Sequence, residues 1–167
     1  MTATGGPRPF VPEDFTAPRE LATDEFRLEP LGPQHNAGDY EAWTSSMAHI
    51  RTTPGFEDWG WPKEMTAEEN LGDLRGHAAD FAARKGFTYT VLAVPGDRVA
   101  GCVYIYPAKD GAPGTAEVRS WVRADRAELD VPLHDAVSAW LADAWPFTAV
   151  RYAPRAAGGG AAPGAGA

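Results

Sequence analysis

Three strand-like segments separated by short turns constrain the fold of this chain more than any other feature. Residues 87–94, 99–106 and 115–122 are rich in valine, threonine and aromatic residues, which favour β-strands. Turn-forming proline, glycine and aspartate occur in residues 95–97 and 109–114 between them. Connections this short join antiparallel neighbours. The sequence therefore predicts a three-stranded antiparallel meander.

A helix and a final strand follow the meander. Leu129, Leu133 and Val137 recur at the spacing of the apolar face of a helix. Pro132 fits only near the start of a helix, so we expect this helix to begin between residues 130 and 132. Residues 147–152 predict one more strand, and a strand that follows a crossover helix can pair in parallel.

The segments before the meander predict one strand and two helices. Residues 26–31 alternate apolar and polar side chains, as a half-buried strand does. Pro33 suits the first turn of a helix that continues to Ile50. Thr66 and Glu69 form a capping-box pattern at the start of a second helix, and Gly86 suits its C-terminal cap. The order β-α-α-β-β-β-α-β predicts an α+β fold with a mixed, mostly antiparallel central sheet flanked by helices.

The length of 167 residues fits one domain with a full hydrophobic core. Residues 1–25 show no helical or strand period, and we expect them to form an extended N-terminal arm. The folded domain is expected at residues 26–155. Residues 156–167 consist mainly of alanine and glycine and have too little apolar surface to fold, which predicts a flexible tail.

The charge balance excludes some classes of partner. The chain has 15 lysine and arginine residues against 23 aspartate and glutamate residues, for a formal net charge of −8. Nucleic acids and anionic membranes both require a basic face, so neither is an expected partner. The sequence shows no signal-peptide pattern and no apolar run near the ~20 residues of a membrane span, which predicts a cytoplasmic protein.

No metal site is expected. Cys102 is the only cysteine, which excludes an internal disulfide and a thiolate cluster. The four histidines include no pair at helical spacing, and the acidic residues are scattered along the chain.

The order of elements resembles that of the GNAT superfamily, the acetyl-CoA-dependent N-acetyltransferases, over residues 26–152. The meander followed by a helix looks like the family's central strands and cofactor helix, and the FRLEPL segment at residues 26–31 is similar to the first strand of short bacterial members. The resemblance implies transfer of an acetyl group from acetyl-CoA to a small-molecule amine.

The chain departs from the family pattern at its C-terminal end. Family members continue after the fifth strand with a helix and two more strands, whereas this sequence has only a short segment before its tail. The resemblance therefore implies a C-terminally truncated sheet with an open edge. Soluble proteins normally cover such edges. We expect a homodimer whose partner completes the sheet, or a cover provided by the N-terminal arm.

The family's cofactor loop aligns with residues 126–131. In the family a Q/R-x-x-G-x-G/A loop holds the pyrophosphate on backbone amides at a helix start. Arg126 matches the first position, but Leu129 and Val131 replace the glycines. Arg119, Arg123 and Arg126 either pair with phosphates in compensation or balance nearby acidic residues. The cofactor residues implied by the resemblance are Trp121, Val122, Arg123, Arg126, Ala127, Leu129 and Val131.

The resemblance also implies a general base and a general acid. Glu117 lies on the strand that commonly carries the carboxylate base in the family, and the alternative is that it pairs with a basic residue across the sheet. Tyr152 lies at the end of the last strand, near the expected cofactor sulfur, and is the candidate acid. Its position differs from the usual one, which is in a helix after that strand.

An aromatic loop predicts the wall of the acceptor site. In the family this wall lies around the first two helices, which corresponds here to residues 49–62. Trp59 and Trp61 either stack on a ligand or attach the loop to the domain. The candidate substrate residues are His49, Arg51, Trp59, Trp61, Tyr104 and Tyr106, and the two tyrosines can equally serve packing.

Three functions are compatible with this sequence. The first is a GNAT-like N-acyltransferase. The second is a non-catalytic GNAT-like binding or regulatory protein that has lost coenzyme A binding, which the missing loop glycines favour. The third is an enzyme that uses the same cleft for chemistry without coenzyme A, since a fold alone does not determine a reaction.

Overall fold

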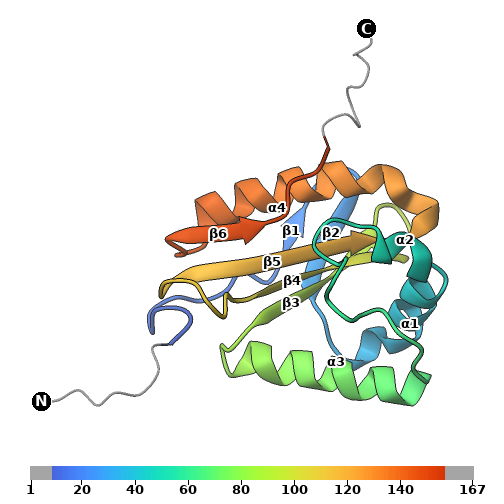
Figure 1. Cartoon of the computed structure of the whole chain (residues 1–167), viewed down its shortest axis with the longest axis horizontal. Coiled ribbons are helices and arrows are strands. Elements are labelled where there is room, and N and C mark those ends of the chain that lie inside the picture. Colours follow the sequence, from blue (N-terminus) through green and yellow to red (C-terminus); the bar gives the residue numbers. More distant parts are fainter. Residues whose placement is uncertain (1–8, 157–167) are drawn as a thin grey trace, which may run out of the picture.

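The computed structural model describes residues 9–156, and a six-stranded sheet forms their centre (Figure 1). Each strand lies beside the one before it in the sequence, and all pairs are antiparallel except the last, which is parallel. The predicted meander and the mixed, mostly antiparallel sheet are therefore confirmed. The strands are β1 (Leu21–Ala22), β2 (Phe26–Pro30), β3 (Phe87–Ala93), β4 (Val99–Pro107), β5 (Thr115–Val122) and β6 (Ala149–Tyr152).

Helices cover both faces of the sheet (Figure 1). α1 and α3 lie on one face and α4 lies on the other. Short 3-10 segments precede α1 and α4. The helical elements are η1 (Pro33–His35), α1 (Asn36–Thr44), α2 (Met47–Arg51), α3 (Ala67–Ala82), η2 (Ala124–Leu129) and α4 (Asp130–Ala144).

Alternation along the strands divides the buried residues into two cores. On β5, Val118 contributes to the core beneath α4, and Trp121 contributes to the core beneath α1 and α3. This is the period-two pattern of a sheet with helices on both faces. Cys102 is fully buried in the second core.

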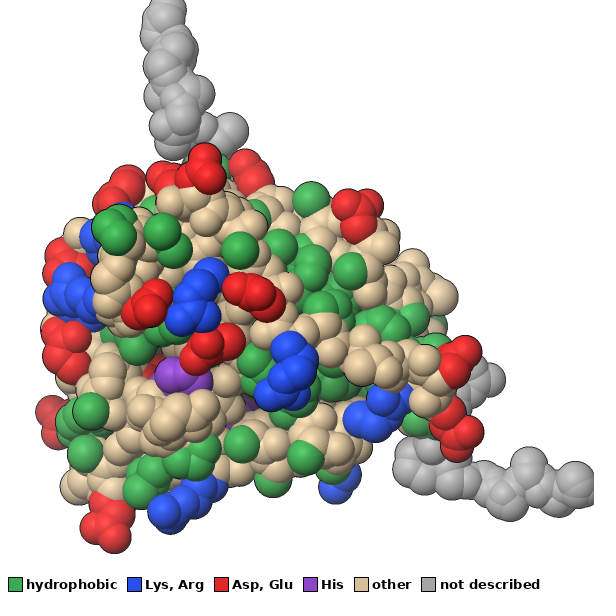
Figure 2. Space-filling model, turned by 180° about the vertical axis from the view of Figure 1, so that it is seen from behind, with side chains coloured by type: hydrophobic (Ala, Val, Ile, Leu, Met, Phe, Trp, Pro, Cys, Tyr) green, Lys and Arg blue, Asp and Glu red, His purple; other side chains and the backbone are tan. Residues whose placement is uncertain are grey.

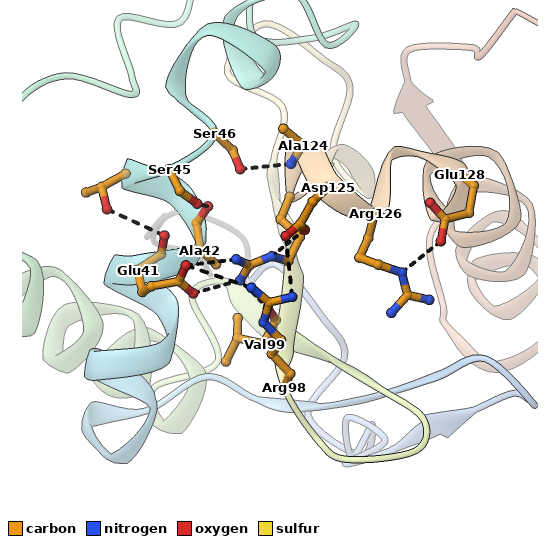
Figure 3. A network of polar contacts seen from close by, with 12 residues as sticks. Glu41, Ala42, Ser45, Ser46, Arg98, Val99, Ala124, Asp125, Arg126 and Glu128 are labelled. Carbon is orange, nitrogen blue, oxygen red and sulfur yellow. Dashed lines mark hydrogen bonds and ion pairs between the residues drawn. The ribbon is translucent and has the colours of Figure 1, made fainter.

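The helix predicted from Pro33 to Ile50 is interrupted, which corrects the sequence analysis. α1 ends at Thr44 and α2 begins at Met47. Ser46 between them leaves the helical conformation, with φ −130° and ψ 18°. Its buried hydroxyl accepts a hydrogen bond of 2.8 Å from the backbone N–H of Ala124 (Figure 3). A contact between distant segments therefore overrides the local helical pattern.

The predicted caps of α3 are half right. Thr66 and Glu69 form the reciprocal capping box, with hydrogen bonds of 3.0 and 2.8 Å. At the other end, the left-handed residue is Arg84 (φ 63°), so Gly86 is not the cap. Gly86 is instead required by packing, because a Cβ there would collide with the ring of Tyr106.

The described part of the N-terminal arm packs against the domain. Phe10 stacks on Phe147 at 5.0 Å between ring centroids, and Phe15 contacts Trp145 at 5.3 Å. Residues 21–22, expected in the arm, form the edge strand β1. Within residues 9–156 no strand pairs with the outer edge of β6. The homodimer that would cover this edge stays a prediction.

Charges of both signs are mixed on the surface. On the face shown in Figure 2, basic side chains stand apart from one another among acidic and apolar ones. Arg27 on β2 pairs with Glu29 at 2.8 Å and with Asp97 at 3.3 Å. This face therefore offers no continuous basic surface to a polyanion.

A buried arginine joins α1 to the end of β5, and two of its partners, Glu41 and Asp125, are labelled in Figure 3. Arg123 is only 2% exposed, and both terminal nitrogens donate to the carboxylate of Glu41 at 2.8 Å. Its Nε donates to Asp125 at 2.7 Å, and Nη1 also donates to the carbonyl of Val99 at 3.1 Å. The hydrogen bond from Arg123 lowers the pKa of Glu41.

We expect Arg123→Ala to destabilise the protein by about 3 kcal/mol, because the substitution removes a buried side chain with its hydrogen bonds and leaves a cavity. Urea unfolding measures this loss. Arg98→Ala is the matched control, since Arg98 is 54% exposed and contacts the same two carboxylates, Glu41 and Asp125. It should cost less than about 1 kcal/mol. Equal losses in the two variants would contradict the role assigned to Arg123.

Candidate functional site

The candidate site is bordered by the half of β5 that does not pair with β6. The two strands pair only over residues 115–118 of β5. Beyond that point Arg155 borders β5: its Nη2 donates to the carbonyl of Ser120 at 2.8 Å, and its Nε donates to Asp130 at 2.7 Å. The Arg155 side chain is 4% exposed. A side chain thus fills the place beside β5 at the start of α4.

The predicted cofactor loop is mostly helical, and Leu129 attaches it to the core. Residues 126–131 span the end of η2 and the first turn of α4, which begins at Asp130 as predicted. Leu129 is fully buried beneath α4, so this position serves the core where the family loop has glycine. Arg126 has a non-helical backbone (φ −131°, ψ 37°), and its Nε donates to Glu128 at 2.7 Å. Ala127 is exposed and Val131 is half-buried.

Two of the three arginines considered as phosphate ligands are engaged elsewhere. Arg123 is buried in the ion pairs with Glu41 and Asp125, so its guanidinium is not free to meet a phosphate in this conformation. Arg119 donates to the carbonyl of Gly55 at 2.8 Å and lies 4.6 Å from the ring centroid of Trp59. Arg126 alone of the three lies on the loop.

Trp121 and Val122 contribute only backbone to the predicted cofactor site. Both side chains are fully buried. The indole N–H of Trp121 donates to the hydroxyl of Tyr104 at 3.0 Å. A ligand beside β5 would therefore meet the main chain at these two positions.

The candidate base and acid lie on opposite faces of the sheet. Tyr152 pairs with Val118 in the strand register and packs on the α4 side, whereas Glu117 lines a cavity on the α3 side. The Tyr152 hydroxyl is 2.6 Å from Oγ of Ser120, and burial raises its pKa to about 12. Glu117 accepts a hydrogen bond of 3.2 Å from Arg119.

Two cavities adjoin along an aromatic wall on the α3 side of the sheet. The first, of about 520 Å³, lies between α1, α3 and the aromatic loop, and the second, of about 500 Å³, is lined by Glu117 and Arg119 among others. Trp59, His77 and Tyr104 line both cavities. The Trp59 and Tyr104 rings are 5.3 Å apart. The structure therefore brings the predicted aromatic residues together at a place large enough for a small molecule.

Of the remaining predicted substrate residues, two line a cavity and two do not. Trp61 lines the first cavity and Tyr106 the second. His49 and Arg51 line neither, and Arg51 instead donates to the carbonyl of Pro62 at 2.9 Å. This contact anchors the aromatic loop, so Arg51 has a supporting place in the structure.

Polar residues that sequence reasoning missed lie on the inner faces of α1 and α3. Asn70 connects them: its Oδ1 accepts from the indole N–H of Trp43 at 3.1 Å, and its Nδ2 donates to Asp39 at 3.1 Å. Burial raises the pKa of Asp39 to about 6, although the hydrogen bond from Asn70 opposes this effect. Asp39 lies four residues before Trp43, on the same helical face, which was the available signal.

His77 on α3 is the second missed residue. Its Nδ1 lies 3.0 Å from both the hydroxyl of Tyr106 and Oγ1 of Thr88. The Tyr106 hydroxyl also donates to Asp80 at 2.8 Å. Burial lowers the pKa of His77, which favours the neutral ring. His77 is thus a fixed polar group between the two cavities.

The described residues hold neither a metal cluster nor a membrane-spanning helix. Within residues 9–156 no group of three histidine, cysteine or acidic side chains is placed to hold a metal ion. In the same residues no helix combines the length and apolar character needed to cross a bilayer.

Comparison with solved structures identifies the fold. The ribosomal-protein-S5-alanine acetyltransferase of Vibrio fischeri matches with a TM-score of 0.58 and 11% identity, over 73% of this chain and 66% of that one. A GCN5-related N-acetyltransferase from Brucella melitensis matches with a TM-score of 0.57 and 18% identity, over 78% and 58%. A ribosomal L7/L12 alpha-N-protein acetyltransferase in complex with coenzyme A gives 0.55 and 11%, over 72% and 65%.

The chain therefore has the fold of the GNAT acetyltransferases, and the resemblance inferred from the order of elements is confirmed at the level of fold. It spans no more than about two thirds of the length of these three proteins. No protein-family model and no curated protein matches the sequence.

We expect Asp39 to make the protein less stable as the pH rises. Its pKa of about 6 lies above the usual value of 3.8, so the folded state holds this proton more tightly than the unfolded state. Stability contributed by the neutral carboxyl is complete below about pH 4 and is lost as the pH rises through about 6, by roughly 3 kcal/mol.

The measurement is urea unfolding of the unmodified protein and Asp39→Asn at pH 4 and pH 7. The stability of the variant relative to the unmodified protein should rise by about 2 kcal/mol between the two values. Asp135→Asn, at a carboxylate with 74% exposure, is the control and should show no such change. A pH-independent difference for Asp39→Asn would show that burial does not hold its proton.

Proposed function

We propose that the protein is an N-acyltransferase that moves an acetyl group from acetyl-CoA to a small-molecule amine. One observation carries the proposal: the half of β5 that β6 leaves unpaired lies beside the start of α4. The second aromatic cavity is lined by Glu117 and Arg119 of the same strand, and the first cavity adjoins the second. The acetyltransferase names of the solved structures with this fold support the reaction class.

The chain offers acetyl-CoA a partial fit. The backbone of residues 119–122 presents polar groups at the strand edge, and the N-terminus of α4 favours an anion. Arg126 pairs with Glu128, which is 62% exposed, and an ion pair this exposed contributes at most about 1 kcal/mol, so a phosphate can replace the carboxylate. The buried Leu129 and the carboxylates of Glu128 and Asp130 oppose tight phosphate binding.

The proposed chemistry uses the two faces of the sheet. Acetyl-CoA would supply the activated acyl group. Glu117 takes a proton from the acceptor amine on the α3 side, where Arg119 holds its carboxylate. When the amine nitrogen takes the acetyl group, the C–S bond of the thioester would break and release the thiolate of coenzyme A. Tyr152 keeps its proton at neutral pH because its pKa is about 12, and it could therefore donate a hydrogen bond to this thiolate from the α4 side.

A non-catalytic binding or regulatory protein with the same fold is the second candidate. Arg155, which fills the place beside Ser120, and Leu129, which fills the loop position of a glycine, favour it. The acceptor also has a second candidate class. Two of the compared structures are named for ribosomal proteins as acceptors, so a protein amine is the alternative to a small molecule.

We expect acetyl-CoA to bind and to displace Arg155, because both require the edge of β5 at Ser120. Calorimetric titration should then show tighter binding by Arg155→Ala, by about threefold or more. Arg151→Ala is the matched control, since Arg151 is 48% exposed and pairs with Asp110 instead. Absence of binding by every variant at millimolar acetyl-CoA would reject the acyltransferase and leave the second candidate.

We expect Glu117→Gln to lower kcat by about 100-fold, the usual contribution of a general base, with little change in acetyl-CoA affinity. Steady-state assays over a panel of amines, followed by release of free thiol, measure the effect. Glu25→Gln changes an exposed carboxylate and should leave the rate as it was. If Glu117→Gln retains full turnover, Glu117 is an ion-pair partner of Arg119 on the same strand and not the base.

A further inference from the structure

Asp39 is a buried carboxylate without a basic partner in the part of the chain that the structure describes. It is 4% exposed, and Nδ2 of Asn70 donates to its Oδ2 at 3.1 Å. Across residues 9–156 no lysine, arginine or histidine forms an ion pair with it. Buried charges in proteins are normally paired, so this carboxylate is an exception that requires an explanation.

The nearby His35 does not supply the missing positive charge. Its Nδ1 accepts a hydrogen bond of 3.0 Å from the backbone N–H of Gly32, so this nitrogen carries no proton. Its Nε2 lies 2.7 Å from Glu29 and donates to that carboxylate. The His35 ring therefore makes its hydrogen bonds with Gly32 and Glu29 and none with Asp39.

Asp39 lines the first cavity, whose other walls are mostly apolar. Trp59, Trp61 and Met65 form part of them, and Trp59 is 38% exposed. The two other charged residues in the lining, Lys63 and Asp73, have opposite signs. The buried carboxylate thus gives the cavity a net negative charge beside aromatic rings, whose faces attract cations.

We propose that this cavity binds an organic ammonium ion with an apolar body. The ammonium group donates to the carboxylate of Asp39, and the body packs against Trp59 and Trp61. A volume of about 520 Å³ accommodates one aromatic ring with a short alkylamine chain. A small inorganic cation would satisfy the carboxylate and leave the apolar walls in contact with water, so the aromatic lining favours an arylalkylamine.

This binding site is separate from the proposed chemistry. Glu117 lines the second cavity and Asp39 lines only the first. The ammonium ion held by Asp39 is therefore not the nitrogen that Glu117 would deprotonate. A ligand that used both cavities would pass along the wall of Trp59, His77 and Tyr104 and would carry two nitrogen groups.

The test is calorimetric titration with 2-phenylethylamine and its neutral analogue 2-phenylethanol, in phosphate buffer because amine buffers would compete. We expect the amine to bind at least about tenfold more tightly than the alcohol, as a charge-assisted hydrogen bond predicts. Ethylamine, which has the ammonium group without the ring, should bind more weakly than 2-phenylethylamine. Acetyl-CoA is absent, so the result is independent of acyl transfer.

Two variants separate the Asp39 contact from general binding. Asp39→Asn should weaken 2-phenylethylamine at least about tenfold and leave 2-phenylethanol unchanged, whereas Asp135→Asn should change neither. Trp59→Leu alters an exposed side chain and should weaken the amine severalfold, which keeps a test available if Asp39→Asn fails to fold. Equal binding of amine and alcohol, equal amine binding by Asp39→Asn, or no amine binding would each overturn the proposal.

Discussion

The guanidinium of Arg123 fixes the relative positions of the two halves of the candidate site. Arg123 directly follows β5, and its guanidinium pairs with Glu41 on α1. The helix that carries Asp39 is therefore connected to the strand that leads to α4. The hydrogen bond from Ala124 to Ser46 adds a second connection at the same level, and it explains why the helix breaks there. Because the pair is bidentate and the guanidinium is buried, small rotations of α1 relative to the sheet would break it.

The division of the sheet into two faces limits where chemistry can occur. Tyr152 and Ser120 belong to the α4 side, and Glu117, His77 and the aromatic wall belong to the α3 side. Paired strands separate these groups over residues 115–118, and the separation ends where β6 ends. Groups from both faces can therefore approach one ligand only at the free edge of β5. A fold without this early end of β6 would keep them apart.

Residues whose neighbours in sequence determine their structure were predictable. The meander, the capping box of Thr66 and the start of α4 near Pro132 follow from local turn and helix chemistry. The contacts of Arg123, Ser46 and Gly86 were not predictable, because their partners lie 82, 78 and 20 residues away in the sequence. The aromatic wall was predicted from Trp59 and Trp61. Asp39, which lines the first cavity beside this wall, was missed, since a single aspartate on a helix resembles any surface residue until its burial is known.

The second half of β5 is bordered by a side chain where another strand would otherwise lie. Opening that edge requires movement of Arg155 and the short segment that carries it, while the sheet keeps its register. Motions of chain segments of this kind take nanoseconds to microseconds, whereas displacement of packed elements takes microseconds to milliseconds. The association rate of a ligand that used this edge would accordingly be set by its encounter with the protein, and Arg155 would affect the dissociation rate.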